Sequence, residues 1–251
     1  MQSMKLFILT SSAGKRLIAK AMLEHPAVQP VLKKGKLVIV AGTTNGYVAE
    51  EVLAAIGQEK GFSRVGFRRG VTMPPGAAGP KVEFTGDVVI SDGEWLKGKE
   101  IFDIVDEMES GDVIVKGANA LDVRRRRAAV LIGHPMTGTA GAAIPAVAGR
   151  RVRLIVPVGL EKRIDGDLDE LTALCNAPES SGPRLLPLPG EVFTELDAIR
   201  LLTGAEARLV AAGGTHGAEG AVWLGVTGTA DQMQAAETLI KSVAAEPPCE
   251  A

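Results

Sequence analysis

The stretch from Gly111 to Val158 constrains the fold of this chain more than any other part of the sequence. It begins with the apolar run Val113 to Lys116, passes a turn with glycine and a basic loop, and continues as a run of small apolar residues before the strand-like segment Arg153 to Val158. Continuous apolar runs bounded by turn residues are typical of strands buried on both faces. Strand, turn, helix and strand in this order predict half of a layered α/β domain, in which ligands bind where strands end.

A second strand and turn of the same kind stand earlier in the chain. Leu37 to Ala41 is another continuous apolar run, and a helical segment from Tyr47 to Ile56 follows the turn GTTNG. A turn that leads into a helix offers free N–H groups and the positive end of the helix dipole, which favour a phosphate or a carboxylate. The alternative is an ordinary turn in which Thr and Asn cap the helix. The predicted anion contacts here are Gly42, Thr43, Thr44, Asn45 and Gly46.

The composition indicates an α/β protein built from two units. The chain has 251 residues, of which 46% are hydrophobic and only 4% aromatic, and 30 glycines, which favours close-packed α/β layers over a β-sandwich. A Pro-, Ser- and Gly-rich stretch from Ala177 to Pro189 marks the boundary between the units. We predict a three-layer Rossmann-like domain with a mostly parallel sheet over residues 1–178, which includes a strand at Val65 to Met73. A smaller ferredoxin-like α+β unit over 185–245, with its first strand at Leu185 to Leu188, and a flexible tail at 246–251 complete the prediction.

Several classes of function are disfavoured by charge and composition. The formal net charge of −2 does not indicate a nucleic-acid-binding protein. The sequence contains no apolar stretch of 18 residues, so we expect no membrane span. Cys175 and Cys249 lack the spacing of a metal site, so we expect no metal and no cofactor, and a reducing cytoplasm is the expected compartment. Base rates alone favour a homodimer.

The turn that follows Val113 to Lys116 carries polar groups that could serve a ligand. Lys116 could neutralise an anion beside Gly117, and Asn119 or Asp122 could hydrogen-bond a hydroxyl, with Asp122 also a candidate for proton transfer. The alternative is that Lys116 is a solvated strand-end charge and Asp122 a cap. Arg124 begins a run of four arginines that could bind phosphate through paired hydrogen bonds, although such runs are more often solvated loops.

Two histidines are further candidates for proton transfer. His134 stands before a loop-to-helix junction whose predicted ligand contacts are Thr137, Gly138 and Thr139. His216 lies with Glu219 in a Gly-rich loop at residues 213–220 that could fold over a ligand. The alternatives are a structural hydrogen bond made by His134 and an ordinary long hairpin loop around His216.

Together these turns resemble a superfamily that contains ribose-5-phosphate isomerase A, glucosamine-6-phosphate deaminase, the CoA transferases, and related translation-factor and methylthioribose-phosphate isomerase proteins. The resemblance rests on GKRLIAKAM followed by LVIVAGTTNGYVAEEV, and on GDVIVKGANALD followed by MTGTAGAAIPAVAGRRVRLIVPV, within residues 12–160. It implies a ligand crevice at the Gly-rich turns and a small α/β lid late in the chain. The sugar-phosphate isomerases of this group have an acidic residue after the Gly-Ala pair, where this chain has Asn119, and no motif matches the glutamate of the CoA transferases.

The sequence therefore favours an enzyme that acts on a small phosphorylated or otherwise anionic metabolite, by isomerisation or group transfer. A non-catalytic metabolite sensor on the same fold is the first alternative, and Asn119 in place of an acid favours it. A structural assembly subunit is the second alternative, and it predicts a crevice filled by apolar side chains.

Overall fold

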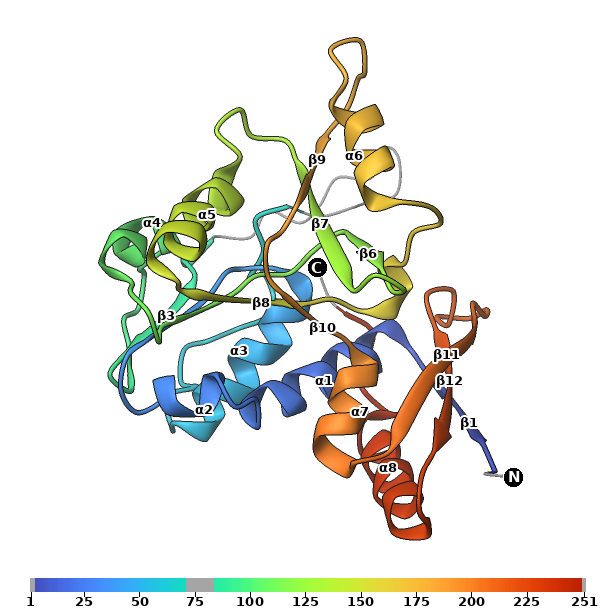
Figure 1. The fold of residues 1–251 in the computed structure, drawn as a ribbon. Helices are drawn as coiled ribbons and strands as arrows, with labels where there is room; N and C mark the ends of the chain where they lie inside the picture. Colours follow the sequence, from blue (N-terminus) through green and yellow to red (C-terminus); the bar gives the residue numbers. More distant parts are fainter. Residues whose placement is uncertain (1–2, 71–83, 250–251) are drawn as a thin grey trace.

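The computed structural model of this protein describes residues 3–70 and 84–249 (Figure 1). Its largest sheet has six strands, and the four at one side of it run parallel, whereas the last two are antiparallel to their neighbours. Both faces of the parallel part are covered, which explains why its strands are continuous apolar runs. In spatial order the strands are β10 (Glu191–Phe193), β8 (Arg153–Pro157), β5 (Val113–Val115), β2 (Lys36–Ile39), β3 (Val88–Ser91) and β4 (Glu94–Trp95).

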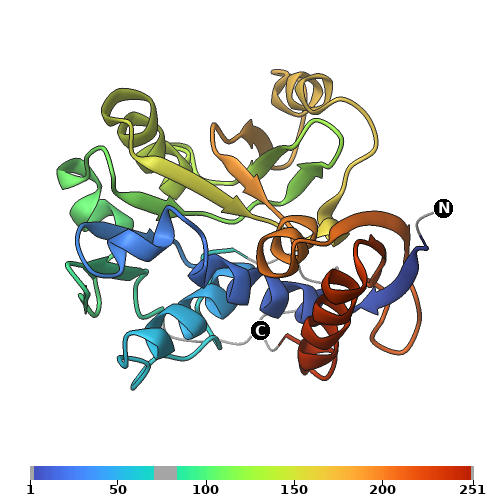
Figure 2. The same cartoon turned by 60° about the horizontal axis from the view of Figure 1, so that its bottom comes forward.

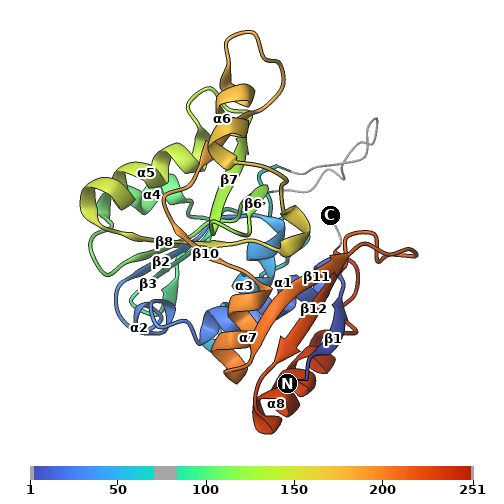
Figure 3. The same cartoon turned by 45° about the vertical axis from the view of Figure 1, so that its right-hand side comes forward.

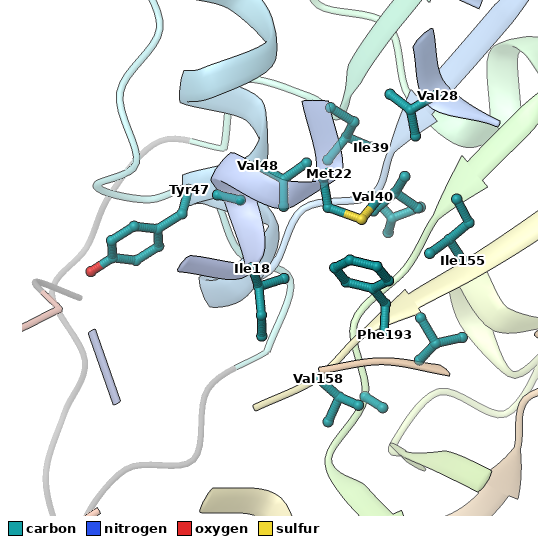
Figure 4. Close-up of a cluster of buried hydrophobic side chains, with 14 of the residues drawn as sticks. Ile18, Met22, Val28, Ile39, Val40, Tyr47, Val48, Ile155, Val158 and Phe193 are labelled. Carbon is teal, nitrogen blue, oxygen red and sulfur yellow. The ribbon is translucent and has the colours of Figure 1, made fainter. Parts of the chain in front are cut away.

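Helices lie on both faces of this sheet (Figures 1 and 3). One face carries α1 (Ser11–Leu23), α2 (Val28–Val31) and α3 (Thr43–Ala55), and the other carries α4 (Ile101–Ile104), the 3₁₀ turn Val105–Glu107 and α5 (Gly138–Arg150). Figure 4 shows Ile18 and Met22 of α1 packed toward the strands, close to Ile39, Ile155 and Phe193. All five side chains are buried, so these layers share one hydrophobic core.

A second, three-stranded sheet stands at the edge of the first. It consists of β6 (Ala120–Asp122), β7 (Arg127–Ile132) and β9 (Arg184–Pro187), all antiparallel, with α6 (Leu168–Asn176) beside it. The run Leu185 to Leu188 was predicted to begin the C-terminal unit, and this prediction is wrong because β9 pairs with β7 instead. The chain then returns to the large sheet through β10.

The third sheet joins the two ends of the chain. β1 (Lys5–Leu9) pairs with β12 (Val222–Thr227), which also pairs with β11 (Glu206–Ala212). Figure 3 shows these strands side by side, and Figure 2 shows the N-terminal strand next to the C-terminal helix α8 (Ala230–Val243). Both α8 and α7 (Glu195–Thr203) begin with a capping box, Thr229 with Gln232 and Thr194 with Asp197.

The observed architecture confirms a mixed α/β fold whose main sheet contains parallel strands. The strand predicted at Val65 to Met73 is absent from the described part of that run: residues 65–70 are irregular, and residues 71–73 lie outside the described residues. Glycine and two arginines in this segment interrupt the apolar pattern that a buried strand needs. Within the described ranges, no helix has the length and apolar character to cross a membrane.

Candidate functional site

A cavity of about 940 Å³ opens where β2 and β5 end and where α3 and α5 begin. Because the two strands are parallel neighbours, their carboxyl ends lie at the same edge of the sheet and bring both Gly-rich turns together. Of the residues predicted from the sequence, the cavity is lined by Gly42, Thr43, Thr44, Asn45, Lys116, Gly117, Asn119, His134, Thr137, Gly138 and Thr139.

Neither helix that begins at the cavity is capped by the side chain of its N-cap residue. The N-cap of α3 is Gly42, which has no side chain, and Thr137 at the N-cap of α5 donates its hydroxyl to the Met136 carbonyl at 2.7 Å instead. By contrast, α1 and α8 begin with Thr10 and Thr229, whose side chains accept hydrogen bonds from the first turn. Among the described residues, the first-turn N–H groups of α3 and α5 have no side-chain acceptor, and the helix dipoles add positive potential at this end of the cavity.

A buried hydroxyl lies in the wall of the cavity. Thr44 is 2% exposed, and its Oγ1 atom has no hydrogen-bond partner among the residues that the structure describes. A buried hydroxyl without a partner costs free energy. Because this oxygen is inaccessible from the cavity, it offers no direct contact to a ligand.

Lys116 is a basic residue of the cavity lining whose pKa is strongly lowered. Its Nζ atom donates to Thr139 Oγ1 at 2.9 Å, and in the described part of the chain no carboxylate lies within ion-pair distance of it. Burial lowers the pKa of Lys116 from 10.5 to about 8, with a smaller contribution from the positive charge of Arg69 and an opposing one from Asp87. Lys116 can therefore exchange a proton near neutral pH.

Arg69 lines the same cavity and is a residue that the sequence did not reveal. Its guanidinium donates to both oxygens of Asp87, at 3.2 and 2.8 Å, and to Glu100 at 2.8 Å. Asp87 is 2% exposed and also accepts hydrogen bonds from the backbone N–H groups of Ala41 and Ile101. Arg69 is thus fixed in the wall of the cavity by two carboxylates, and its pKa is raised although burial opposes this.

Lys162 is a third basic residue of the lining and was also missed. It follows β8 in the chain, donates to the Ala118 carbonyl at 2.7 Å, and has its pKa lowered by burial. Since β8 is a parallel neighbour of β5, the rule that strand ends meet at one edge could have identified it. Among the described residues, the lining contains no aspartate or glutamate, so its ionisable groups are all basic or histidine.

His134 and Asn119 have part of their hydrogen-bonding capacity in use. The backbone N–H of Met136 donates to His134 Nδ1 at 3.1 Å, which places the proton of a neutral ring on Nε2 and makes that atom a donor. Asn119 Oδ1 accepts from the backbone N–H of Leu131 at 3.0 Å. Asn45 Nδ2 binds the carbonyls of Val40 and Val115, and so ties the ends of β2 and β5 together.

Four predicted residues lie outside the cavity. Asp122 ends β6 and accepts from the backbone N–H of Arg125 at 2.8 Å, a bond that lowers its pKa, and Arg124 is an exposed residue of the same hairpin turn. His216 lies in the exposed β11–β12 loop and contacts Thr215, and Gly46 lies inside α3 under the side chain of Arg64. The β6–β7 hairpin carries Asp122 and Arg124 away from the turn at Lys116, and these four residues take no part in the site as observed.

The rest of the arginine run is also engaged elsewhere. Arg125, Arg126 and Arg127 form ion pairs with Asp167, Asp197 and Asp169. These contacts hold the hairpin against α6 and α7, and they explain the run without a ligand.

Comparison of the chain with protein-family models, with curated proteins and with solved structures returns no match. In the described part of the chain, no group of three or more His, Cys, Asp or Glu side chains is arranged to hold a metal ion.

Proposed function

We propose that this protein binds a small phosphorylated or otherwise anionic metabolite in the cavity between α3 and α5. The observation that carries the proposal is the convergence of two helix N-termini without side-chain caps on one cavity that also holds Lys116. Helix N-termini bind anions through their free N–H groups and their dipoles. The absence of carboxylates from the described lining leaves this positive potential unopposed at the surface of the cavity.

The size and rim of the cavity favour an organic anion over inorganic phosphate. A volume of about 940 Å³ is at the upper end of the range typical of small-molecule sites. Phe102, Leu131 and Met136 line it and are 52%, 47% and 78% exposed, so an apolar part of a ligand would find contacts near the opening.

Isomerisation or group transfer remains the reaction class that we propose, on a Rossmann-like domain with a smaller ferredoxin-like unit. The resemblance of the Gly-rich turns to those of the superfamily of sugar-phosphate isomerases and CoA transferases supports this proposal. Lys116, as a lysine that can lose its proton near neutral pH, is the group that favours catalysis.

A metabolite sensor is the second candidate. Asn119 stands where the resemblance leads us to expect an acid, and its Oδ1 atom is already hydrogen-bonded to the backbone. A structural subunit would need a crevice filled by apolar side chains, and the open cavity argues against that alternative.

A thermal-shift screen of the purified protein against sugar phosphates, nucleotides, CoA thioesters and inorganic phosphate tests the proposal. A ligand at 100 times its Kd stabilises the native state by about 2.7 kcal/mol, which raises Tm by roughly 5–10 °C for a chain of this length. The shift should become smaller in Lys116→Met, which removes the charge from the cavity lining, and persist in Lys34→Met, which removes an exposed lysine. A folded protein that shows no shift with any of these compounds would contradict the proposal.

A further inference from the structure

Lys116 differs from an ordinary anion-binding lysine in its surroundings. It follows the last residue of β5, and its Nζ atom contacts the hydroxyl of Thr139 in the first turn of α5. A lysine that only binds an anion works best as a full positive charge, whereas the burial of Lys116 favours its neutral amine. We propose that Lys116 is a nucleophile that condenses with the carbonyl group of a phosphorylated or carboxylated aldehyde or ketone to form an imine. This inference rests on the proposed function, because the anionic group of the ligand would lie at the helix N-termini.

Burial is the main factor that favours loss of the Lys116 proton, and the two charged neighbours act in opposite directions. Arg69 is held in its charged state by Asp87 and Glu100, and its positive charge disfavours a second cation nearby. Asp87 attracts the ammonium, but its oxygens are already occupied by Arg69 and by two backbone N–H groups. Lysines that form imines are activated by desolvation or by a neighbouring cation, and Lys116 has both.

The fraction of reactive amine follows from the pKa. With a pKa of about 8, roughly half of the Lys116 side chains are neutral at pH 8. For a solvated lysine with a pKa near 10.4, the neutral fraction at this pH is roughly one in 250. At pH 8, Lys116 should therefore present about 100-fold more of the reactive neutral amine than an exposed lysine does.

The step balances without a further reactant. The nitrogen lone pair of neutral Lys116 attacks the carbonyl carbon, so that a C–N bond forms and the oxygen takes up a proton. The carbinolamine then loses its oxygen as water, which carries both hydrogens of the original amine, and a C=N bond remains. His134 Nε2–H and the Thr139 hydroxyl are neutral donors in the cavity lining that could hydrogen-bond the departing oxygen.

Pyridoxal 5′-phosphate is a suitable probe because it combines an aldehyde with a phosphate and fits a cavity of this volume. The full-length protein is incubated with it, reduced with borohydride, digested, and mapped by mass spectrometry. We expect Lys116 to carry at least 10-fold more label than the exposed Lys33 and Lys34, with a pH dependence of labelling centred near 8. Pyridoxine 5′-phosphate, which has the phosphate and no aldehyde, should protect Lys116 from the label.

A matched pair of variants separates this inference from the proposed function. Lys116→Arg keeps the positive charge but cannot lose its proton, so it should still bind pyridoxine 5′-phosphate in a thermal-shift assay and should lose the selective label. Lys116→Met should lose the label and weaken binding of pyridoxine 5′-phosphate. Equal labelling of Lys116 and the exposed lysines, in wild-type protein that does bind pyridoxine 5′-phosphate, would overturn the imine and leave the anion site standing. Failure of both phosphates to bind, with no selective label, would overturn both.

Discussion

Replacement of Lys116 by methionine is expected to stabilise the folded protein at neutral pH. The structure lowers the pKa of this side chain from 10.5 to about 8, chiefly by burial. At pH 7 the ammonium is charged in both states, but it is buried in the native state and solvated in the unfolded chain, so the charge destabilises the native state. At about 1.36 kcal/mol per pKa unit, this difference corresponds to roughly 3 kcal/mol. Loss of the hydrogen bond to Thr139 Oγ1 costs about 1 kcal/mol. The expected net gain in the free energy of unfolding is about 2 kcal/mol.

The pH dependence of this gain has a definite sign. Between about pH 8 and 10.5, the unfolded chain binds more protons at this position than the native state does, so the stability of the wild type rises with pH across that window. Methionine does not titrate and lacks this rise. The advantage of Lys116→Met is therefore expected to be largest below pH 8 and to fall to zero or below near pH 10.

Urea denaturation of the wild type and of Lys116→Met at pH 7 and at pH 10 measures the gain in stability and its pH dependence. The relevant quantity is the difference in the free energy of unfolding between the two proteins at each pH, because the other titrating groups are the same in both. Lys34→Met, an exposed substitution of the same kind, should change stability by less than about 0.5 kcal/mol at either pH. If Lys116→Met is destabilising at pH 7, or if its effect is the same at both pH values, the burial argument for Lys116 is refuted.

Three further predictions concern the scaffold of the site. Asp87→Ala removes the buried carboxylate that accepts hydrogen bonds from Arg69 and from two backbone N–H groups. The free energy of unfolding, measured in urea, should fall by about 3–5 kcal/mol, and a loss below about 1 kcal/mol would contradict this network. Burial, with a contribution from Glu161, raises the pKa of Glu195 from 4.5 to about 8, so the native state holds that proton more tightly and wild-type stability falls as pH rises from about 4.5 to 8. Glu195→Gln should accordingly be more stable than the wild type at pH 8.5 and lose that advantage at pH 5. If urea unfolding gives the same difference in the free energy of unfolding at both pH values, this explanation is excluded. Gly190→Ala places a Cβ atom 2.7 Å from Leu154 Cγ and 2.9 Å from the Leu154 carbonyl, and should cost about 1–3 kcal/mol in thermal or urea unfolding without changing which anions bind; an unchanged Tm would be the contrary result.

The sequence predicted three of the four parallel strands, β2, β5 and β8, because their signal is local. Leu37 to Ala41 and Val113 to Val115 are continuous apolar runs; β2 overlaps the first and β5 coincides with the second. The pairing of β1 with β12 was not predicted, since it joins residues more than 200 positions apart and depends on the packing of the whole chain. The short strands β6, β7 and β9 have mixed composition, and their pairing likewise could not be inferred from periodicity.

In the candidate site, too, residues next to a predicted strand could be predicted, whereas residues placed by distant contacts could not. The turns at Gly42 and at Lys116 could be predicted because each follows its own strand, and parallel pairing brings them together. Asp122 was grouped with Lys116 because it lies close in sequence, but the β6–β7 hairpin turns it away. Arg69 was missed because Asp87 and Glu100, which position it, lie 18 and 31 residues further along the chain.

Backbone amide NMR of the ¹⁵N-labelled protein during a titration with pyridoxine 5′-phosphate tests the central claim most directly. The anion should shift the amide resonances of Thr43 to Asn45 and of Gly138 to Ala140 together, with one saturating curve, because both helix N-termini line one cavity. The amides of the exposed β11–β12 loop around His216 should not move. Shifts confined to other surfaces, or the absence of a saturable change at either helix N-terminus, would contradict an anion site at this cavity.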